Sequence, residues 1–460
     1  MGRDYWRSLD ELAGKQGRRP DPELIKWLED EVPPASRRHF LKLMGASLGL
    51  AGLTSCRWPR ELIVPFAKRP EDRIPGVPQQ FATIMEMGGA ALGLLVTSFD
   101  GRPTKVEGNP LHPASLGGTH LWAQASILEL YAPDRSRQVL HEGKPASWDD
   151  FTAFVAQKRN ELVATRGQGL VVLAQESSSP SLAAHAGRLA EEFPAAVWLV
   201  DEPWSWQSQT ATVAHFSDAA RRWVLHLDKA RVVVTLDADV LFAHPDAVRH
   251  ARGFASTRRG GESQSRWYVG EAALSLTGAA ADHRLPVPAR QIGALALHLI
   301  EEVARLGVSV PGELRGQVPA TVVGLPPAEP LPPLAEPAMA FVRTAARDLV
   351  AHRGAGLVVA GAAQTGAHHV ALALNLALDN IGRTVTLAPL DGLAAASATR
   401  MARPRIGGGS LGELFSPTAG GLGELVQLVE QGAVRTLLVL GGNPAYTARP
   451  GLHLKELLKG

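Results

Sequence analysis

From residue 165 onward, short apolar runs alternate along the chain with segments that have helical spacing. Four of these runs are predicted to be strands: Leu170–Ala174, Ala196–Val200, Arg231–Leu236 and Arg266–Val269. Between the first two, residues 181–193 place four apolar side chains on one helical face, namely Leu182, Ala186, Leu189 and Phe193. Such alternation predicts an α/β fold in which parallel sheets have helices on both faces.

A second set of the same kind follows towards the end of the chain. Its predicted strands are Leu357–Ala360, Thr384–Leu387 and Thr436–Leu440, with helices over residues 367–379 and 421–431. We expect Gly361 and the run Gly441-Gly442-Asn443-Pro444 to lie at the carboxyl edges of these sheets, because they follow strands directly. Open parallel sheets bind ligands at that edge.

The part of the chain before these sets is rich in turns. An Asp-Gly pair at residues 100–101 separates two strand-like runs, 91–98 and 104–107, which predicts a β-hairpin. The resulting division of the chain has six segments: an N-terminal extension (1–35), an export signal (36–56), a small β-rich region (57–140), a first α/β unit (141–307), a proline-rich linker (308–337) and a second α/β unit (338–460).

Paired arginines near the start of the chain indicate export by the twin-arginine route, which carries folded proteins. The residues that form this signal are Arg37, Arg38, Phe40, Leu41 and Lys42. The uncharged run that follows, residues 43–55, is shorter than the about 20 apolar residues that span a bilayer. The alternative is an ordinary buried helix, which the glycines of this run make less stable.

Cys56 follows Leu53-Thr54-Ser55, a pattern typical of a lipobox in which the thiol accepts diacylglycerol and becomes the new amino terminus. Two or three acyl chains would anchor the protein firmly to a membrane, whereas one chain is marginal. An unmodified structural thiol is the alternative. Because Cys56 is the only cysteine, this chain excludes an intramolecular disulfide, a cysteine-ligated iron–sulfur cluster and a multi-thiolate zinc site.

Composition changes this picture little. The chain has 460 residues, of which 45% are hydrophobic and 20% charged, enough for a packed core in two or three units. Its formal net charge of +2 gives no reason to expect a nucleic-acid partner. No segment has the length and apolarity of a transmembrane helix.

Several sequence islands resemble the molybdopterin oxidoreductase superfamily. The strongest runs over residues 101–113, continues through residue 117, and contains Gly108-Asn109-Pro110-Leu111-His112-Pro113. The other islands are residues 74–78, 124–137, 276–286 and 438–444. Most closely, the chain resembles the large periplasmic iron–sulfur subunit of alternative complex III, a quinol-oxidising respiratory assembly, and its long leader before Arg37 fits that subunit's signal.

The chain also departs from that superfamily in one important segment. Where many relatives have a cysteine followed by a lysine, residues 117–124 (Gly-Gly-Thr-His-Leu-Trp-Ala-Gln) have neither. The resemblance therefore implies the molybdopterin-oxidoreductase fold without its cofactor, a structural subunit on the periplasmic side of the inner membrane. We assign no catalytic, cofactor-binding or metal-ligating residue, and we expect iron–sulfur clusters and haem only in partner chains.

The resemblance implies several partners: an iron–sulfur subunit or missing C-terminal half, a multihaem cytochrome c and an integral membrane quinol-binding subunit. It also implies that the family's large subunit continues past a point like Gly460, so that a split or truncated gene is expected. One alternative is a fragment of an active molybdenum bis-pterin oxidoreductase with serine or aspartate on the metal. Another is an independent lipoprotein that binds a small molecule at a sheet edge.

Polar side chains at strand ends and in loops are further candidate sites. Asp237 and Asp239 follow a strand and could form a catalytic pair, but a polar strand end and helix cap is more ordinary. The segment Gly361-Ala362-Ala363-Gln364-Thr365-Gly366 lacks the glycine spacing of a dinucleotide loop. In Asp282-His283-Arg284, we expect Asp and Arg to pair locally and stabilise a loop.

Two adjacent histidines, His368 and His369, lie near Asp379. Adjacent residues on a helix point in different directions, and no third ligand follows at a helical interval on the same face. We therefore expect a solvated or hydrogen-bonded pair rather than a metal site.

Overall fold

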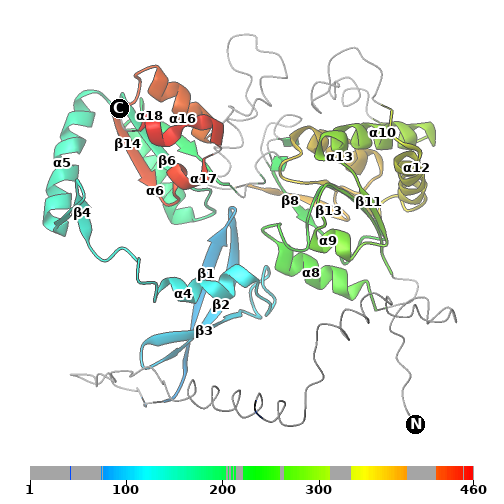
Figure 1. The fold of residues 1–460 in the computed structure, drawn as a ribbon, viewed down its shortest axis with the longest axis horizontal. Coiled ribbons are helices and arrows are strands. Elements are labelled where there is room, and N and C mark those ends of the chain that lie inside the picture. Colours follow the sequence, from blue (N-terminus) through cyan, green and yellow to red (C-terminus); the bar gives the residue numbers. More distant parts are fainter. Residues whose placement is uncertain are drawn as a thin grey trace. The chain divides into compact units, whose positions relative to one another are not determined.

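The computed structural model describes residues 42, 74, 76–203, 206, 209–210, 212–213, 221–259, 264–310, 333–390, 421–448 and 450–458 (Figure 1). The chain divides into two compact units, residues 1–73 and 74–460, and every element named below belongs to the second. Most of the predicted export and lipidation residues lie outside the described residues: Arg37, Arg38, Phe40, Leu41 and Cys56. Lys42 is described and is exposed.

An antiparallel sheet opens the second unit, with strands β1 (Gln79–Met87), β2 (Ala90–Phe99) and β3 (Arg102–Gly108) in that order. β2 and β3 are joined at Asp100 (φ 50°) and Gly101 (φ 85°), so the predicted Asp-Gly hairpin is confirmed. A tight hairpin turn requires positive φ, which Asp and Gly tolerate. Helix α4 (Leu121–Glu129) packs on this sheet and buries Ala123 in a small apolar core.

A parallel sheet of four strands forms the largest core. Its order is β11 (His283–Pro286), β10 (Arg266–Glu271), β9 (Val232–Leu236) and β12 (Gly356–Ala360). Every residue of β9 and β12 is buried, as expected where both faces of a parallel sheet are covered. The predicted α/β class and these predicted strand positions are therefore confirmed.

Helices cover both faces of this sheet (Figure 1). Adjacent residues of β10 point to opposite faces: Trp267 meets Phe254 of α8 (Ala247–Ser256), and Tyr268 meets Phe341 of α12 (Glu336–Ala351). The remaining helical elements around the sheet are α9 (Leu276–Ala279), the 3₁₀ turn η1 (Ala289–Gln291), α10 (Ile292–Arg305) and α13 (Thr365–Ala377). Sequence reasoning located α13 but not α8, α10 or α12.

One predicted strand differs from the parallel pattern. β13 (Val385–Pro389) pairs antiparallel with β8 (Arg221–Leu225), a strand that the sequence did not predict. The pairing extends past the strand ends, because His226 N donates to Thr384 O over 2.8 Å. The expectation that this run belongs to a parallel sheet is therefore wrong.

A second parallel sheet has the order β14 (Thr436–Leu440), β6 (Leu170–Ala174) and β7 (Val197–Val200). All its strands were predicted, as were the helices α6 (Pro180–Glu192) and α16 (Gly421–Glu430). Both parallel sheets combine strands from the two sides of residues 308–337, since β14 pairs with β6 and β12 pairs with β9. Short helical elements end the described chain: α17 (Pro444–Thr447), η3 (Pro450–Leu452) and α18 (Leu454–Leu457).

Helix α5 (Trp148–Ala164) follows a small hairpin of β4 (Val139–His141) and β5 (Lys144–Ala146). It begins at Ser147, whose side chain forms a capping box with Asp150. No residue of α5 is buried, and Trp148 is 73% exposed. Among the described helices, none has the length and apolarity needed to cross a membrane.

The open edge of β12 is closed by a buried amide. Asn375 on α13 accepts a hydrogen bond from Val358 N (3.0 Å) and donates one to Val358 O (2.7 Å). Asn380 in turn donates to the Asn375 side chain (3.0 Å). No described strand pairs with β12 on this side, and the amide satisfies the two backbone groups of Val358, which would otherwise be buried without these partners.

We expect Asn375→Ala to destabilise the protein. The substitution leaves Val358 N and O buried without partners, at a cost of about 1–3 kcal/mol for each group. Urea unfolding would measure the loss against Asn160→Ala, an exposed position on α5 where a change within about 0.5 kcal/mol is expected. Equal unfolding free energies for the two variants would contradict this role of Asn375.

Candidate functional site

The carboxyl edge of the larger parallel sheet is the first place where the sequence predicted functional groups. Asp237 follows β9 in the left-handed region, with φ 58°. Its carboxylate accepts hydrogen bonds from Ala272 N (3.1 Å) and from Gln364 Nε2 (2.9 Å). Asp237 therefore connects the loops that follow three neighbouring strands.

Gly361, at the end of β12, lies against the same turn. Its N–H donates to Leu236 O (2.9 Å), and a Cβ at this position would overlap the carbonyl oxygen of Asp237. The glycine is required by this close approach of two backbones, which accounts for it without a nucleotide. The comparison with a dinucleotide loop therefore gains no support from the structure.

Asp239 and Glu271 are also occupied by hydrogen bonds. Asp239 Oδ1 accepts from the backbone N (3.1 Å) and the hydroxyl (2.6 Å) of Thr277, at the start of α9. Glu271 accepts from the hydroxyl of Ser275 (2.6 Å) and from Arg284 Nε (2.5 Å). The carboxylates at this edge hold loops in place, in agreement with the polar strand end that the sequence favoured.

Asp282 and Arg284 do not pair with each other, so that expectation is wrong. Asp282 forms two 2.8 Å hydrogen bonds with Arg258 and accepts a third from Trp267 N, while Arg284 pairs with Glu271. Each of these two side chains therefore pairs with an opposite charge from another segment of the chain, Asp282 with Arg258 and Arg284 with Glu271 of β10. Burial alone would raise the pKa of Asp282, but the hydrogen bonds from Arg258 and Trp267 hold it below its ordinary value.

The carboxyl edge of the smaller parallel sheet contains a shallow hollow. It is lined by the end of β6 and by residues that follow all three strands: Leu173, Ala174, Gln175, Asp201, Pro203, Gly441, Gly442, Asn443, Pro444 and Thr447. The prediction that Gly441 to Pro444 lie at such an edge is confirmed. The hollow measures about 20 Å³, room for about one water molecule.

Local contacts determine the shape of that hollow. Gly441 and Gly442 both take positive φ (69° and 68°), and a Cβ on Gly441 would lie 2.9 Å from the Gln175 side chain. The Asn443 side chain accepts from Tyr446 N (3.2 Å) and so caps α17. The polar groups in this turn thus serve the turn itself.

The segment that contains Asn109 and His112 likewise builds a compact turn. Asn109 Oδ1 accepts from Leu111 N, and His112 Nδ1 lies 3.3 Å from both Gly93 N and Ala114 N, which donate to it. Further along, His120 caps α4 by accepting from Ala123 N (3.0 Å). These side chains anchor the segment to β2 and start the following helix.

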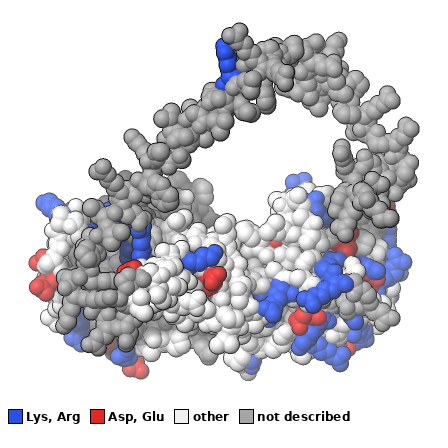
Figure 2. Space-filling view, turned by 90° about the horizontal axis from the view of Figure 1, so that it is seen from below, with Lys and Arg blue, Asp and Glu red and all other residues white. Residues whose placement is uncertain are grey.

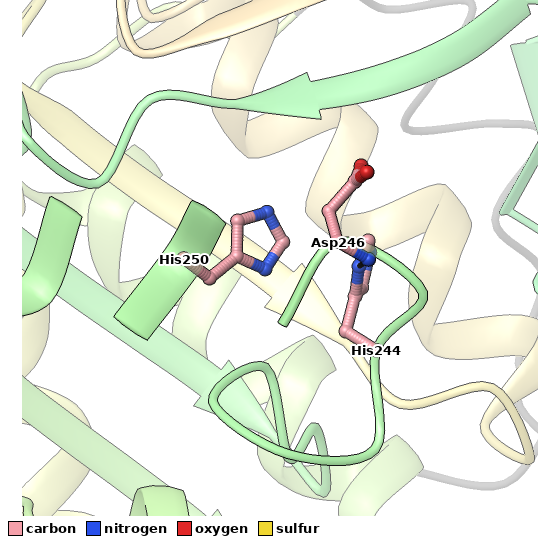
Figure 3. A group of neighbouring side chains, drawn as sticks. All are labelled: His244, Asp246 and His250. Atoms are coloured by element: carbon pink, nitrogen blue, oxygen red, sulfur yellow. Dashed lines mark hydrogen bonds between the residues drawn. The ribbon is translucent and has the colours of Figure 1, made fainter. Parts of the chain in front are cut away.

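A group that the sequence analysis missed lies at the start of α8. His244, Asp246 and His250 are all buried, and their potential ligand atoms lie within 4.8 Å of one another. Figure 3 shows the His250 ring directed from the helix towards the two loop residues. The Trp206 ring lies 4.4 Å from the His244 ring, centroid to centroid.

The electrostatics of this group follow from its burial. Burial lowers the pKa of His250 to about 4, and burial together with His250 lowers that of His244 well below its usual value. Burial would raise the pKa of Asp246, but Arg222 (2.7 Å) and then the histidines and Arg249 hold it well below its ordinary range. At neutral pH the group thus contains two neutral imidazoles and one carboxylate.

The sequence offered one signal for this group, the spacing His-x-Asp-x-x-x-His directly after the β9 loop. The aspartate and second histidine are one helical turn apart, so they share a face of α8. The histidine pair that the sequence did single out is different: His368 and His369 are buried in α13, so the expected solvation is wrong. Asp379 pairs with Arg353 (2.8 Å) instead.

Surface charge is mixed on the face drawn in Figure 2, where basic and acidic side chains lie among one another and wide uncharged areas separate them. This distribution agrees with a formal net charge of +2. It provides no single-sign field on this face for steering a charged partner.

No family model matches this chain. The chain is 26% identical over 296 residues to the menaquinone reductase, molybdopterin-binding-like subunit, of Nitratidesulfovibrio vulgaris. That similarity includes 59% of this chain and 40% of the relative, so the chain matches well under two thirds of the relative's length. Among solved structures, acetylene hydratase from Pelobacter acetylenicus matches with a TM-score of 0.47 and 13% identity, over 65% of this chain and 43% of that one.

We expect His368→Gln to reduce the acid sensitivity of the fold. Burial, with a contribution from His369, lowers the pKa of His368 to about 3, whereas an unfolded histidine titrates near about 6.5. As the pH falls from the pKa of the unfolded histidine towards that of the folded one, the unfolded chain gains a proton that the folded chain lacks. The free energy of unfolding therefore falls by about 1.4 kcal/mol per pH unit.

Urea unfolding from about pH 7 to about pH 5 would measure this slope. The variant should have a shallower slope than the original protein. His185→Gln, at an exposed position on α6, should leave the slope unchanged. A slope that is the same in all three proteins would contradict the assignment to His368.

Proposed function

We propose that this chain is a cofactor-free, molybdopterin-oxidoreductase-like structural subunit of a quinol-oxidising respiratory complex of the alternative complex III kind. In this role it is exported folded, anchored through Cys56 and held on the periplasmic face of the inner membrane. The observation that carries the proposal is its similarity to the molybdopterin-binding-like subunit of a menaquinone reductase. The paired arginines and the Leu-Thr-Ser-Cys sequence support the location.

Among the described residues, neither sheet edge offers a site that fits a pterin cofactor, which supports the proposal of a cofactor-free subunit. At the larger sheet edge, Asp237, Asp239 and Glu271 are engaged by neighbouring backbone and side-chain donors. At the smaller edge the hollow has room for about one water molecule. The turn at residues 117–124 offers no thiolate, and its His120 caps a helix. These observations support a role in assembly, and we assign no chemical step to this chain.

Exposed apolar side chains support the expectation of partner subunits. Helix α5 presents Trp148, Phe151 and Phe154, which are 46–73% exposed. Leu438 and Val439, adjacent on β14, are each 40% exposed. Because adjacent residues of a strand face opposite sides, both faces of β14 are incompletely covered, whereas strands of parallel sheets are normally buried on both faces. In the proposed complex these surfaces face the iron–sulfur, cytochrome c and membrane subunits.

Purification of the membrane complex through a tag on this chain tests the proposal directly. We expect mass spectrometry to find iron–sulfur, haem and integral membrane partners, and metal analysis of the same sample to find no stoichiometric molybdenum. Stoichiometric molybdenum with extractable pterin would instead make this chain part of an active oxidoreductase. Recovery of the chain without membrane or haem subunits would favour an independent lipoprotein.

The anchoring step has its own test. In Cys56→Ser the acyl acceptor is lost, so we expect a wash that dissociates the partner subunits to release the protein from the membrane into the soluble fraction, whereas the lipidated original stays bound. Replacement of Arg37 and Arg38 by lysine, which preserves charge, should instead keep the precursor in the cytoplasm. Fractionation followed by immunoblotting measures both outcomes. Unchanged membrane retention of the Cys56→Ser protein would contradict lipid anchoring.

A further inference from the structure

We propose that His244, Asp246 and His250 bind a divalent metal ion of the zinc class, which joins the loop after β9 to the first turn of α8. The three residues are 5%, 7% and 1% exposed, and one potential ligand atom from each lies within 4.8 Å of the others. Two imidazoles and a carboxylate suit a borderline cation such as Zn²⁺ better than Mg²⁺ or Ca²⁺, which prefer oxygen ligands.

His250 is oriented for coordination. Its Nδ1 lies 3.0 Å from Val240 O, a carbonyl that can only accept, so Nδ1 holds the ring proton. Nε2 therefore has an unprotonated lone pair, and this buried atom has no hydrogen-bond partner among the described residues. A backbone carbonyl that fixes the tautomer and direction of a histidine is typical of metal-ligating imidazoles.

His244 supplies a second buried nitrogen. Its Nδ1 accepts a hydrogen bond from Asp246 N (3.0 Å), and its Nε2 has no partner among the described residues. Because Nδ1 accepts this bond, the neutral ring carries its proton on Nε2, so coordination through Nε2 requires that proton to leave Nε2 and the contact of Nδ1 with Asp246 N to open. Two unpartnered imidazole nitrogens in one buried group are costly without a ligand, which is the main physical reason for the proposal.

Asp246 supplies the negative charge. Arg222 lies 2.7 Å from Oδ1, whereas Oδ2 has a longer 3.5 Å contact with Arg249 and is the oxygen available to the ion. The arginine side chains are 31% and 22% exposed, so solvent screens part of their repulsion of a cation. Zn–N bonds of about 2.0–2.1 Å require tetrahedral ligand atoms about 3.4 Å apart, which small side-chain rotations can provide.

The test uses the purified full chain, stripped with a chelator and dialysed against Zn²⁺. We expect elemental analysis to find stoichiometric zinc in the original protein and in His185→Gln, which removes an exposed histidine on α6. His250→Gln should lose that zinc while retaining its circular dichroism spectrum. Equal zinc in the original protein and a folded His250→Gln variant would overturn the proposal, as would the absence of stoichiometric zinc from the original protein.

A second readout does not depend on whether a variant folds. Co²⁺ added to the stripped original protein should give visible ligand-field absorption of a four-coordinate site, with a solvent molecule as the fourth ligand. Zn²⁺ should displace it stoichiometrically. Spectra identical to those of aqueous Co²⁺ would overturn the proposal. Neither outcome bears on the respiratory role, because the proposed ion is structural and is measured separately from molybdenum.

Discussion

Burial of both faces of the larger parallel sheet is the constraint on which the rest of this structure depends. Every residue of β9 and β12 is buried, and helices on each side supply the large apolar groups that cover Trp267 and Tyr268. A sheet that is dry on both faces cannot place polar side chains along its strands without satisfying them internally. The buried amide of Asn375, on α13, is accordingly hydrogen-bonded to the backbone at the edge of β12.

The same constraint explains what happens at the strand ends. Apart from Thr235 in β9, the polar groups of β9 and β12 lie where the chain leaves the sheet. Carboxylates follow β9 and end β10, where open α/β proteins place ligands. Here neighbouring donors form hydrogen bonds with the carboxylates of Asp237, Asp239 and Glu271. The backbone at Gly361 lies so close to Asp237 that position 361 has no room for a side chain. At this edge the described carboxylates hold the loops that follow the strands in fixed positions.

Sequence reasoning succeeded where structure depends on local pattern. The apolar runs located β6, β9, β10, β12 and β14, and the Asp-Gly pair located the hairpin. It failed where structure depends on distant partners. β8 was missed because it begins with two arginines, and α5 was missed because it has no buried face. The strand order was not predictable either, because β12 pairs with β9 across more than a hundred residues of chain. The His244 group combines loop and helix residues around Pro245, where neither helical nor strand periodicity applies.

The buried carboxylates and the buried imidazoles differ in how far the chain supplies their partners. The buried acids have partners supplied by the chain, including Asp246, which pairs with two arginines. The Nε2 atoms of His244 and His250 have no partner among the described residues, and burial favours neutral rings, with the lone pair on Nε2 in His250 and the proton on Nε2 in His244. In this group the carboxylate is paired with arginines, whereas one nitrogen of each imidazole has no partner among the described residues. Such a group is better matched to a structural cation than to acid–base catalysis, since neither imidazole accepts a proton readily at neutral pH. A metal that fixes the start of α8 would stabilise the loop at the sheet edge without adding a reactive group there. This is compatible with the proposed role as a structural subunit.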